Sequence, residues 1–381
     1  MFALWILTLG QFIACKGCQE TKVQDIDTGA VEEFSNNWGK WLDMDQTPNG
    51  EPVIAYYDVT HGAIGLATGT INSGAVSWSH QEIDGYPNEQ GLDQGDRGAY
   101  ASVAVDNAGT TWVAYYDASL KTLRYGMRAD GASEWTLGVA DNGSGGSPDA
   151  GLFSDIALDS QGYPVVAHYD QGSGALRVAH WDGTAFSGQV VDVGEDSEDE
   201  SGTLPSNTGK FASIAIVDGF EYIAYYDAAG ANLMLASGLP GNYAVEVVDA
   251  DGDVGRWTSI AVVDGIVHIA YQDVTGEAVK VASGSPGSWT RTVVDGGKMV
   301  GADTAILGST NGLVVAYQDS YNNDILIATQ NGDSWNTQTL GGVDGDGALG
   351  FHNELVEVNG TVYAATYNFT TETVWFSSIG E

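Results

Sequence analysis

The chain has 381 residues and a formal net charge of −38, from 51 Asp and Glu against 13 Lys and Arg. That balance excludes a protein that binds nucleic acid through its phosphates, because Lys and Arg supply most of that affinity. Charged residues make up only 17% of the chain and hydrophobic residues 43%, which is a globular composition. The 52 Gly are about twice the usual share and predict an all-β protein with many tight turns.

The first 14 residues are apolar and are followed by Cys15. This stretch is too short to cross a bilayer as a helix and suits the apolar region of a secretory signal. The sequence FIAC, which ends at Cys15, resembles the lipobox of bacterial lipoproteins, in which the Cys is lipidated. We therefore predict that residues 1–19 are a signal and a short tether, with lipidation at Cys15. The predicted location is the bacterial cell envelope, at the outer surface or in the periplasm, and plain secretion or an unprocessed N-terminus are the alternatives.

Cys15 and Cys18 also form a C-x-x-C pair, which is typical of redox or zinc chemistry. No second pair and no nearby His completes a four-ligand zinc site, and no βαβ pattern surrounds the pair. The lipid interpretation is therefore favoured over the redox one.

One sequence unit recurs seven times. Its most regular part is the string IAYYD with its variants, which end at Asp58, Asp117, Asp170, Asp227, Asp273, Asp319 and, in a degenerate copy, Asn368. A small residue follows each of these positions after nine residues, and this fixed interval predicts a β-hairpin of constant length. A usually aromatic position precedes each by 16 or 17 residues: Trp41, Tyr100, Phe153, Phe211, Trp257 and Phe351, with Asp303 as the exception. We expect a strand to start at this position.

Another aromatic residue stands six residues before an Asp in five units, as in Trp78 and Asp84, and Trp335 keeps this spacing to Gly341. Each unit thus contains four short strands, with no helical period between them. Seven such units predict a seven-bladed β-propeller that forms one domain over residues 20–381. The last unit lacks its fourth strand, and residues 21–27 match the register of that strand. We therefore expect an N-terminal outer strand to complete the last blade and close the ring.

The repeats S-I-A-x-D, h-A-Y-Y-D and L-x-x-A followed by Trp resemble those of bacterial secreted β-propeller proteins. They are more distantly similar to the repeats of sialidase-like and fucose-binding lectin propellers. The resemblance covers residues 20–378 and implies the propeller fold. It implies no single function, because propellers serve as lectins, hydrolases, lyases and scaffolds alike.

In an up-and-down blade, the turns between the second and third strands lie at the same end as the crossovers between blades. We call this end the variable face, because the crossovers differ in length and such loops usually carry binding sites. The face is acidic, but the Asp that ends each second strand is expected to cap its own hairpin.

Candidate ligand-binding residues surround the central channel. They are the aromatic residues Trp41, Tyr100, Phe153, Phe211 and Trp257, with Asp43 and Asp155 two residues after the first and the third of them. The positions equivalent to Asp43 in the other units are expected at Ser102, Ser213, Ser259, Ala305 and Asn353. Aromatic faces above polar groups suit stacking on sugars, and the alternative is that these rings wedge between blades.

Calcium is the one candidate cofactor. The loop DADGD offers Asp249, Asp251 and Asp253, and the loop GVDGDG offers Asp344 and Asp346. Alternating carboxylates can converge on one hard cation. The first loop departs from the EF-hand pattern, since its sixth position is Val254 and its twelfth is Ile260. A solvated turn is the alternative.

Catalytic templates are mostly absent from the sequence, which has no G-x-S-x-G elbow, no H-E-x-x-H and no Asp-box. We therefore predict a monomeric, non-catalytic propeller that binds a glycan or a protein partner through the variable face and meets a membrane only through its lipid anchor. One alternative is a carbohydrate-active hydrolase or lyase that uses two of the many carboxylates. Another is a scaffold subunit without a small ligand.

Overall fold

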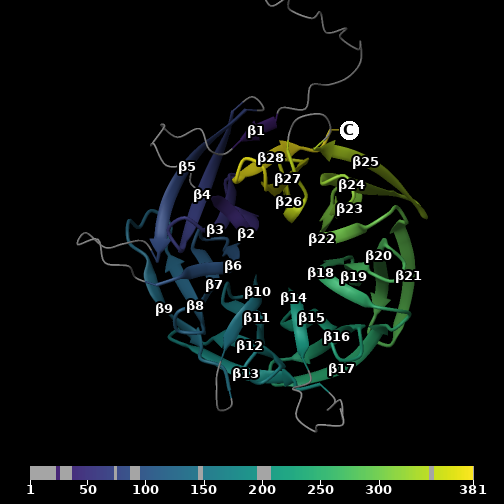
Figure 1. The fold of residues 1–381 in the computed structure, drawn as a ribbon. Helices are drawn as coiled ribbons and strands as arrows, with labels where there is room; N and C mark the ends of the chain where they lie inside the picture. Colours follow the sequence, from purple (N-terminus) through teal and green to yellow (C-terminus); the bar gives the residue numbers. More distant parts are fainter. Residues whose placement is uncertain are drawn as a thin grey trace, which may run out of the picture.

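The structure is a computed structural model that describes residues 23–25, 37–72, 75–85, 95–144, 149–194, 207–342 and 347–380. Cys15, Asp344 and Asp346 lie outside these residues. The described chain forms 28 β-strands in seven four-stranded antiparallel sheets, which surround a central channel as the blades of a propeller (Figure 1). Among the described residues there is no helical segment with the length and apolarity of a membrane span. The predicted all-β, seven-bladed fold is confirmed.

Each blade has its first strand at the channel. These innermost strands are β2 (Trp38–Gln46), β6 (Arg97–Val105), β10 (Ala150–Leu158), β14 (Thr208–Val217), β18 (Val254–Val263), β22 (Val300–Ser309) and β26 (Phe351–Val358). The second strands carry the repeated string and are β3 (Pro52–Asp58), β7 (Thr111–Asp117), β11 (Pro164–Asp170), β15 (Phe220–Asp227), β19 (Ile266–Asp273), β23 (Gly312–Asp319) and β27 (Thr361–Asn368). We number the blades one to seven in this order.

The outer half of each blade is the third and fourth strand. The third strands are β4 (Ala63–Asn72), β8 (Thr122–Arg128), β12 (Ala175–Trp181), β16 (Asn232–Leu239), β20 (Ala278–Ser285), β24 (Asp324–Asn331) and β28 (Thr373–Ser378). The fourth strands of blades one to six are β5 (Ala75–Asp84), β9 (Thr136–Asp141), β13 (Phe186–Asp192), β17 (Asn242–Asp249), β21 (Ser288–Asp295) and β25 (Ser334–Gly341).

The ring closes through the N-terminal strand. In blade seven the outermost strand is β1 (Val23–Asp25), which pairs antiparallel with β28 so that Val23 faces Ser377 and Asp25 faces Trp375 (Figure 1). This is the predicted closure, within residues 23–25. The pairing covers an edge of β28 that would otherwise be open to other strands.

The hydrophobic core is divided among the blade interfaces. Each of seven clusters of buried apolar residues joins two neighbouring blades, and one of them packs Leu42 and Ile54 of blade one against Tyr367 and Phe376 of blade seven. A blade buries little by itself, since its two faces are apolar mainly where another blade covers them. The stability of each blade therefore depends on contact with its neighbours.

A tyrosine hydroxyl links most blades to the blade before them. Tyr115, Tyr225, Tyr271 and Tyr317 donate to the Asp that ends the preceding outer strand, at 2.6 to 2.8 Å. In blade three, His168 takes the place of Tyr and contacts Asp141. Blade six ends its outer strand in Gly341, and the matching position of blade seven is Thr366. The missing Asp of blade six and the missing Tyr of blade seven therefore lie at the same blade interface.

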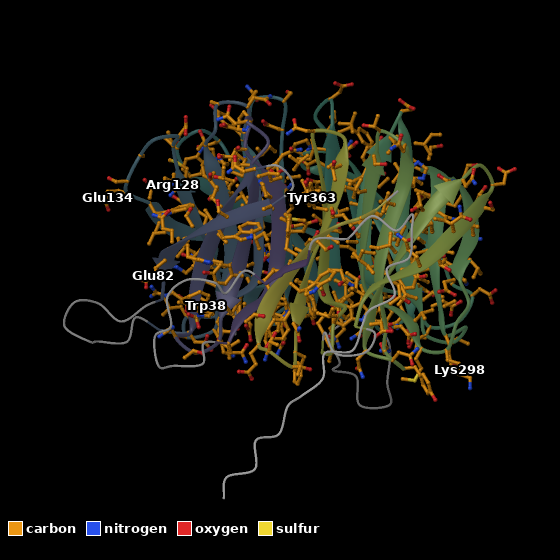
Figure 2. All side chains as sticks on the ribbon, turned by 90° about the horizontal axis from the view of Figure 1, so that it is seen from above. Trp38, Glu82, Arg128, Glu134, Lys298 and Tyr363 are labelled. Atoms are coloured by element: carbon orange, nitrogen blue, oxygen red, sulfur yellow. The ribbon has the colours of Figure 1, made fainter. Side chains whose placement is uncertain are left out.

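The two ends of the ring carry different loops. Figure 2 places Lys298, from a crossover between blades, at one end together with Trp38. It places Arg128, which ends the third strand β8, and Glu134, which lies between β8 and the fourth strand β9, at the other. The turns after the second strands lie at the first of these ends, which is the variable face.

Candidate functional site

Seven residues, one from each innermost strand, form a collar at the variable end of the channel. They are Trp41, Tyr100, Phe153, Phe211, Trp257, Asp303 and His352, and all have positive φ angles between 46° and 54°. Bulky residues rarely adopt this conformation, and here it occurs where a bulge shifts the register of the strand. The bulge turns each side chain toward the channel.

A glycine stands two residues before every collar residue. These glycines are Gly39, Gly98, Gly151, Gly209, Gly255, Gly301 and Gly350, with φ between 91° and 120°. A side chain at these positions would clash with the preceding blade. At Gly255, for example, a Cβ atom would lie 2.6 Å from the Cα of Leu233. The glycines thus allow the backbones of adjacent blades to approach closely just before the collar.

Two features of the collar differ from those predicted from the sequence. The strands begin about three residues before the collar position in blades one to six, not at it. In blade seven the collar residue is His352 rather than Phe351, so the residue two positions on is Glu354 rather than Asn353. The pattern Gly-x-collar residue is present in the sequence at Gly350 and His352, and it is the signal that identifies the correct register.

The aromatic residues of the collar touch one another across the blade interfaces. Their ring centroids are 5.0 Å apart for Trp41 and Tyr100 and 4.5 Å apart for Phe211 and Trp257. Phe153 lies between, at 4.8 Å from Tyr100 and 4.6 Å from Phe211. Each ring is also partly exposed to the channel. The rings therefore both pack between blades and line an open space.

A second ring of contacts lies one step deeper in the channel. The side chain two residues after the collar accepts a hydrogen bond from a backbone N–H of the next blade, at distances between 2.7 and 3.2 Å. The acceptors are Asp43, Ser102, Asp155, Ser213 and Ser259. Asp43 and Asp155, predicted to bind ligand, thus hold neighbouring blades together. Ala305 of blade six has no such acceptor, and among the described residues no such bond is recorded for Glu354.

Polar side chains next to the collar fix its backbone. The hydroxyls of Ser154, Thr258 and Thr304 each donate to the backbone carbonyl of the collar residue in the preceding blade. The acceptors are Tyr100, Phe211 and Trp257 in that order. Asn353 does the same to the carbonyl of Asp303, at 2.8 Å. At four of the seven blade interfaces the carbonyl of a collar residue thus accepts a hydrogen bond from the next blade.

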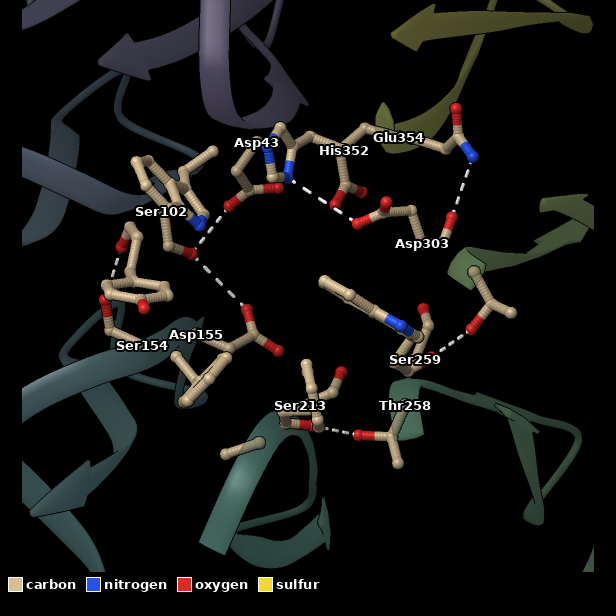
Figure 3. A pocket seen from close by; sticks show the side chains of 18 of the residues that line it. Asp43, Ser102, Ser154, Asp155, Ser213, Thr258, Ser259, Asp303, His352 and Glu354 are labelled. Atoms are coloured by element: carbon tan, nitrogen blue, oxygen red, sulfur yellow. Dashed lines mark hydrogen bonds and ion pairs between the residues drawn. The ribbon is translucent and has the colours of Figure 1, made fainter. Parts of the chain in front are cut away.

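The collar and the deeper ring enclose a cavity of about 300 Å³. Four carboxylates line it: Asp43, Asp155, Asp303 and Glu354 (Figure 3). The hydroxyl of Ser102 lies between Asp43 and Asp155, at 2.6 and 3.3 Å from their oxygens. On the other side, Nδ1 of His352 is 3.6 Å from Oδ1 of Asp303. The size is at the lower end of the range for small-molecule sites.

Burial and mutual repulsion shift the pKa values of these groups. Burial raises the pKa of Asp303 to about 7, and burial with the nearby Asp43 raises that of Asp155 to about 7. The pKa of Glu354 is raised well above its usual value by burial and by the other three carboxylates. Burial, with a contribution from Lys40, lowers the pKa of His352 to about 4. At neutral pH the histidine is uncharged and the carboxylates share protons as a group.

The Asp residues that end the second strands cap their hairpins. Asp58 accepts the backbone N–H of His61, and Asp117 accepts that of Leu120. Corresponding bonds are made by the other members of the set, Asp170, Asp227, Asp273 and Asp319. These carboxylates therefore have the structural role expected from the sequence.

The loop predicted to bind calcium is engaged with other groups. Asp249 is 1% exposed and accepts the hydroxyl of Tyr271 at 2.7 Å, with Lys280 and Arg291 each 3.6 Å away. Asp253 pairs with Arg256 at 2.7 Å. No group of three or more His, Cys, Asp or Glu in the described ranges is placed to hold a metal ion. Calcium at Asp249, Asp251 and Asp253 stays a prediction, and Asp344 and Asp346 lie outside the described residues.

Several arginines are held by buried acids between blades. Arg97 contacts Asp84 at 2.6 Å and Asp117 at 2.9 Å, and Arg177 contacts Asp141 at 2.8 Å. These guanidinium groups serve the blade interfaces, and none of them lines the central cavity.

Comparisons with known proteins support the fold. No protein-family model and no curated protein matches the sequence. The structure is similar to that of the polysaccharide lyase Uly1, with a TM-score of 0.55 and 10% identity over 93% of this chain and 94% of that one. A prolyl endopeptidase matches with a TM-score of 0.52 and 13% identity, over 88% of this chain and 47% of that one. The fucose-specific lectin from Aleuria aurantia matches with a TM-score of 0.46 and 16% identity, over 80% and 95%. At these identities the likeness to the lyase and to the endopeptidase concerns the fold alone.

Proposed function

We propose that the protein is a non-catalytic propeller that binds a saccharide in the central cavity, at the variable face. The observation that carries this proposal is that five partly exposed aromatic rings of the collar and four carboxylates line one cavity. Aromatic faces stack on the apolar faces of sugar rings, and carboxylates accept strong hydrogen bonds from hydroxyl groups. The cavity admits only a small group, so the proposed ligand is the end of a glycan chain.

A glycan-array screen of the full chain, with and without calcium, tests the proposal. Trp257→Ala removes a collar ring and is expected to lower binding of any array hit at least tenfold, whereas Trp257→Phe keeps a stacking face and retains most of it. Tyr321→Ala is the matched control, because Tyr321 is an aromatic residue of the turn after β23 that is 66% exposed and does not line the cavity. Unchanged binding by Trp257→Ala would place the ligand elsewhere.

A second candidate function is a carbohydrate-active hydrolase at the same cavity. The observation that favours it is the pKa of about 7 at both Asp155 and Asp303, since a glycosidase needs a carboxylic acid that keeps its proton near neutral pH. Incubation of array hits with the protein, followed by chromatography of the products, decides between binding and cleavage. Cleavage that disappears in Asp303→Asn would establish the enzyme.

The location is a separate proposal that rests on the N-terminal sequence. Lipidation at Cys15 would anchor the propeller in the cell envelope. Mass spectrometry of the N-terminal peptide after expression in a bacterium tests it, and an unmodified Cys15 in the mature protein would contradict it.

A further inference from the structure

The charges around the central cavity indicate which saccharides it accepts. Asp43, Asp155, Asp303 and Glu354 line the cavity, and no Lys or Arg is among the described residues that do so. His352 adds no positive charge at neutral pH. The lining is therefore acidic without a compensating cation. A saccharide that carries a carboxylate, such as a uronic acid, would meet repulsion there rather than a partner.

The basic residues nearest the collar in sequence are directed to other groups. Lys40 and Lys210, each just before a collar residue, lie 5.8 and 5.6 Å from the ring centroids of Tyr367 and Tyr169. Arg256 lies 5.5 Å from the centroid of Tyr226 and is also paired with an aspartate. These three cations sit over tyrosines of the second strands, and none of them lines the cavity.

The carboxylates differ in the number of hydrogen bonds that they accept from the protein. Asp43 accepts the N–H of Val103 at 2.7 Å and Asp155 that of Ile214 at 2.8 Å. Within the described chain no hydrogen bond is recorded to the carboxylate of Glu354. In the part of the chain that the structure describes, the Asp303 carboxylate contacts only His352. The side of the cavity formed by blades six and seven thus offers carboxylate oxygens that a ligand can use.

A bare metal ion does not suit this arrangement. The carboxylates stand around an open space, and no three of them are placed to hold one ion. An organic cation fits better, because its charge can lie near one or two carboxylates while the rest of the molecule fills the cavity. Aromatic faces, of which the collar offers five, also attract ammonium groups.

We propose that the saccharide bound in the central cavity carries a protonated amine, which the carboxylates of Asp303 and Glu354 receive while the collar rings hold the sugar. This inference rests on the proposed function and specifies its ligand class as amino sugars with a free ammonium group. Both carboxylates line the cavity. The Asp303 carboxylate accepts the backbone N–H of His352 in blade seven, and Asn at this position keeps an oxygen that can accept the same bond. The two charges can therefore be neutralised with little loss of contact between blades.

Isothermal titration of the full chain with two matched tetrasaccharides tests the proposal. The β-1,4-linked glucosamine tetramer and cellotetraose have the same backbone and differ in an ammonium or a hydroxyl at position 2 of each ring. We expect one glucosamine tetramer per chain, bound at least tenfold more tightly than cellotetraose. We expect the double variant Asp303→Asn, Glu354→Gln to lose this preference. Asp264→Asn, at an exposed turn on the opposite face, makes the same chemical change outside the cavity and should keep it.

Four other outcomes are informative. Equal affinity for both tetrasaccharides would overturn the charge inference and leave saccharide binding intact. Binding of tetralysine as tightly as the glucosamine tetramer, or a preference unchanged in the double variant, would show nonspecific attraction to a chain of net charge −38 and would overturn the inference as well. Binding of neither tetrasaccharide, together with no hit on the array, would refute the proposed function itself.

Discussion

Neutralising Asp303 should make the protein more stable at alkaline pH and change little at acidic pH. Asp303 is 9% exposed, lies at a φ of 47° and has no cationic partner in the cavity. Asn has nearly the same shape and tolerates this backbone conformation well. The substitution Asp303→Asn therefore removes the buried charge with little steric change.

The size of the effect follows from the raised pKa of Asp303, which moves from 3.8 to about 7 in the folded protein. One pKa unit corresponds to about 1.4 kcal/mol, so ionising this group costs the folded state up to about 4 kcal/mol. The folded state binds the proton more tightly than the unfolded state. The stabilisation is thus fully present below pH 3.8 and is lost as the pH rises through 7. Asp303→Asn should raise the free energy of unfolding by up to about 4 kcal/mol at pH 8.

Thermal unfolding followed by circular dichroism at pH 4 and pH 8, at constant ionic strength, measures this difference. With an unfolding entropy of about 2.1 cal/mol/K per residue, the expected increase in Tm at pH 8 is up to about 5 °C. Asp264→Asn is the control, since Asp264 is exposed at a turn with a φ of 51° and undergoes the same loss of charge. A Tm difference from the parent chain that is the same at both pH values would refute the reasoning. So would a variant less stable than the parent at pH 8.

Three further predictions concern the ring. Deletion of residues 20–27 should lower the Tm by many degrees, because the strand at Val23–Asp25 covers the edge of β28; an unchanged Tm would contradict this closure. Tyr271→Phe should lower the free energy of unfolding in urea by about 1 to 3 kcal/mol, because the buried Asp249 loses a hydrogen bond of 2.7 Å. A decrease below roughly 0.3 kcal/mol, the error of the measurement, would mean that the hydroxyl contributes nothing to stability. For the loop 249–253, the predicted calcium site implies that millimolar calcium raises the Tm more than magnesium at equal ionic strength, and equal shifts would reduce the effect to screening.

The sequence alone determined the number of blades, their order and the closure of the ring. It could do so because each unit repeats the same local pattern, and the spacing within a hairpin depends only on residues close together in the chain. The role of Asp58 and its equivalents followed in the same way, since a turn cap acts within three residues. The strand between residues 23 and 25 was predictable because a ring with one missing strand leaves two open edges.

The tertiary structure decided which residues meet in the channel and what they do there. Asp43 and Asp155 are about two blades apart, and only the ring brings both to the hydroxyl of Ser102. The same closure adds Glu354, which lies more than 300 residues from Asp43 and whose collar neighbour, His352, breaks the aromatic pattern. The hydrogen bonds that the deeper ring of the channel makes between blades join positions 47 to 60 residues apart, where local periodicity carries no information. Burial raises the pKa values of the four carboxylates, and repulsion among them adds to the shift at Glu354. Both effects exist only once the blades have come together around the channel.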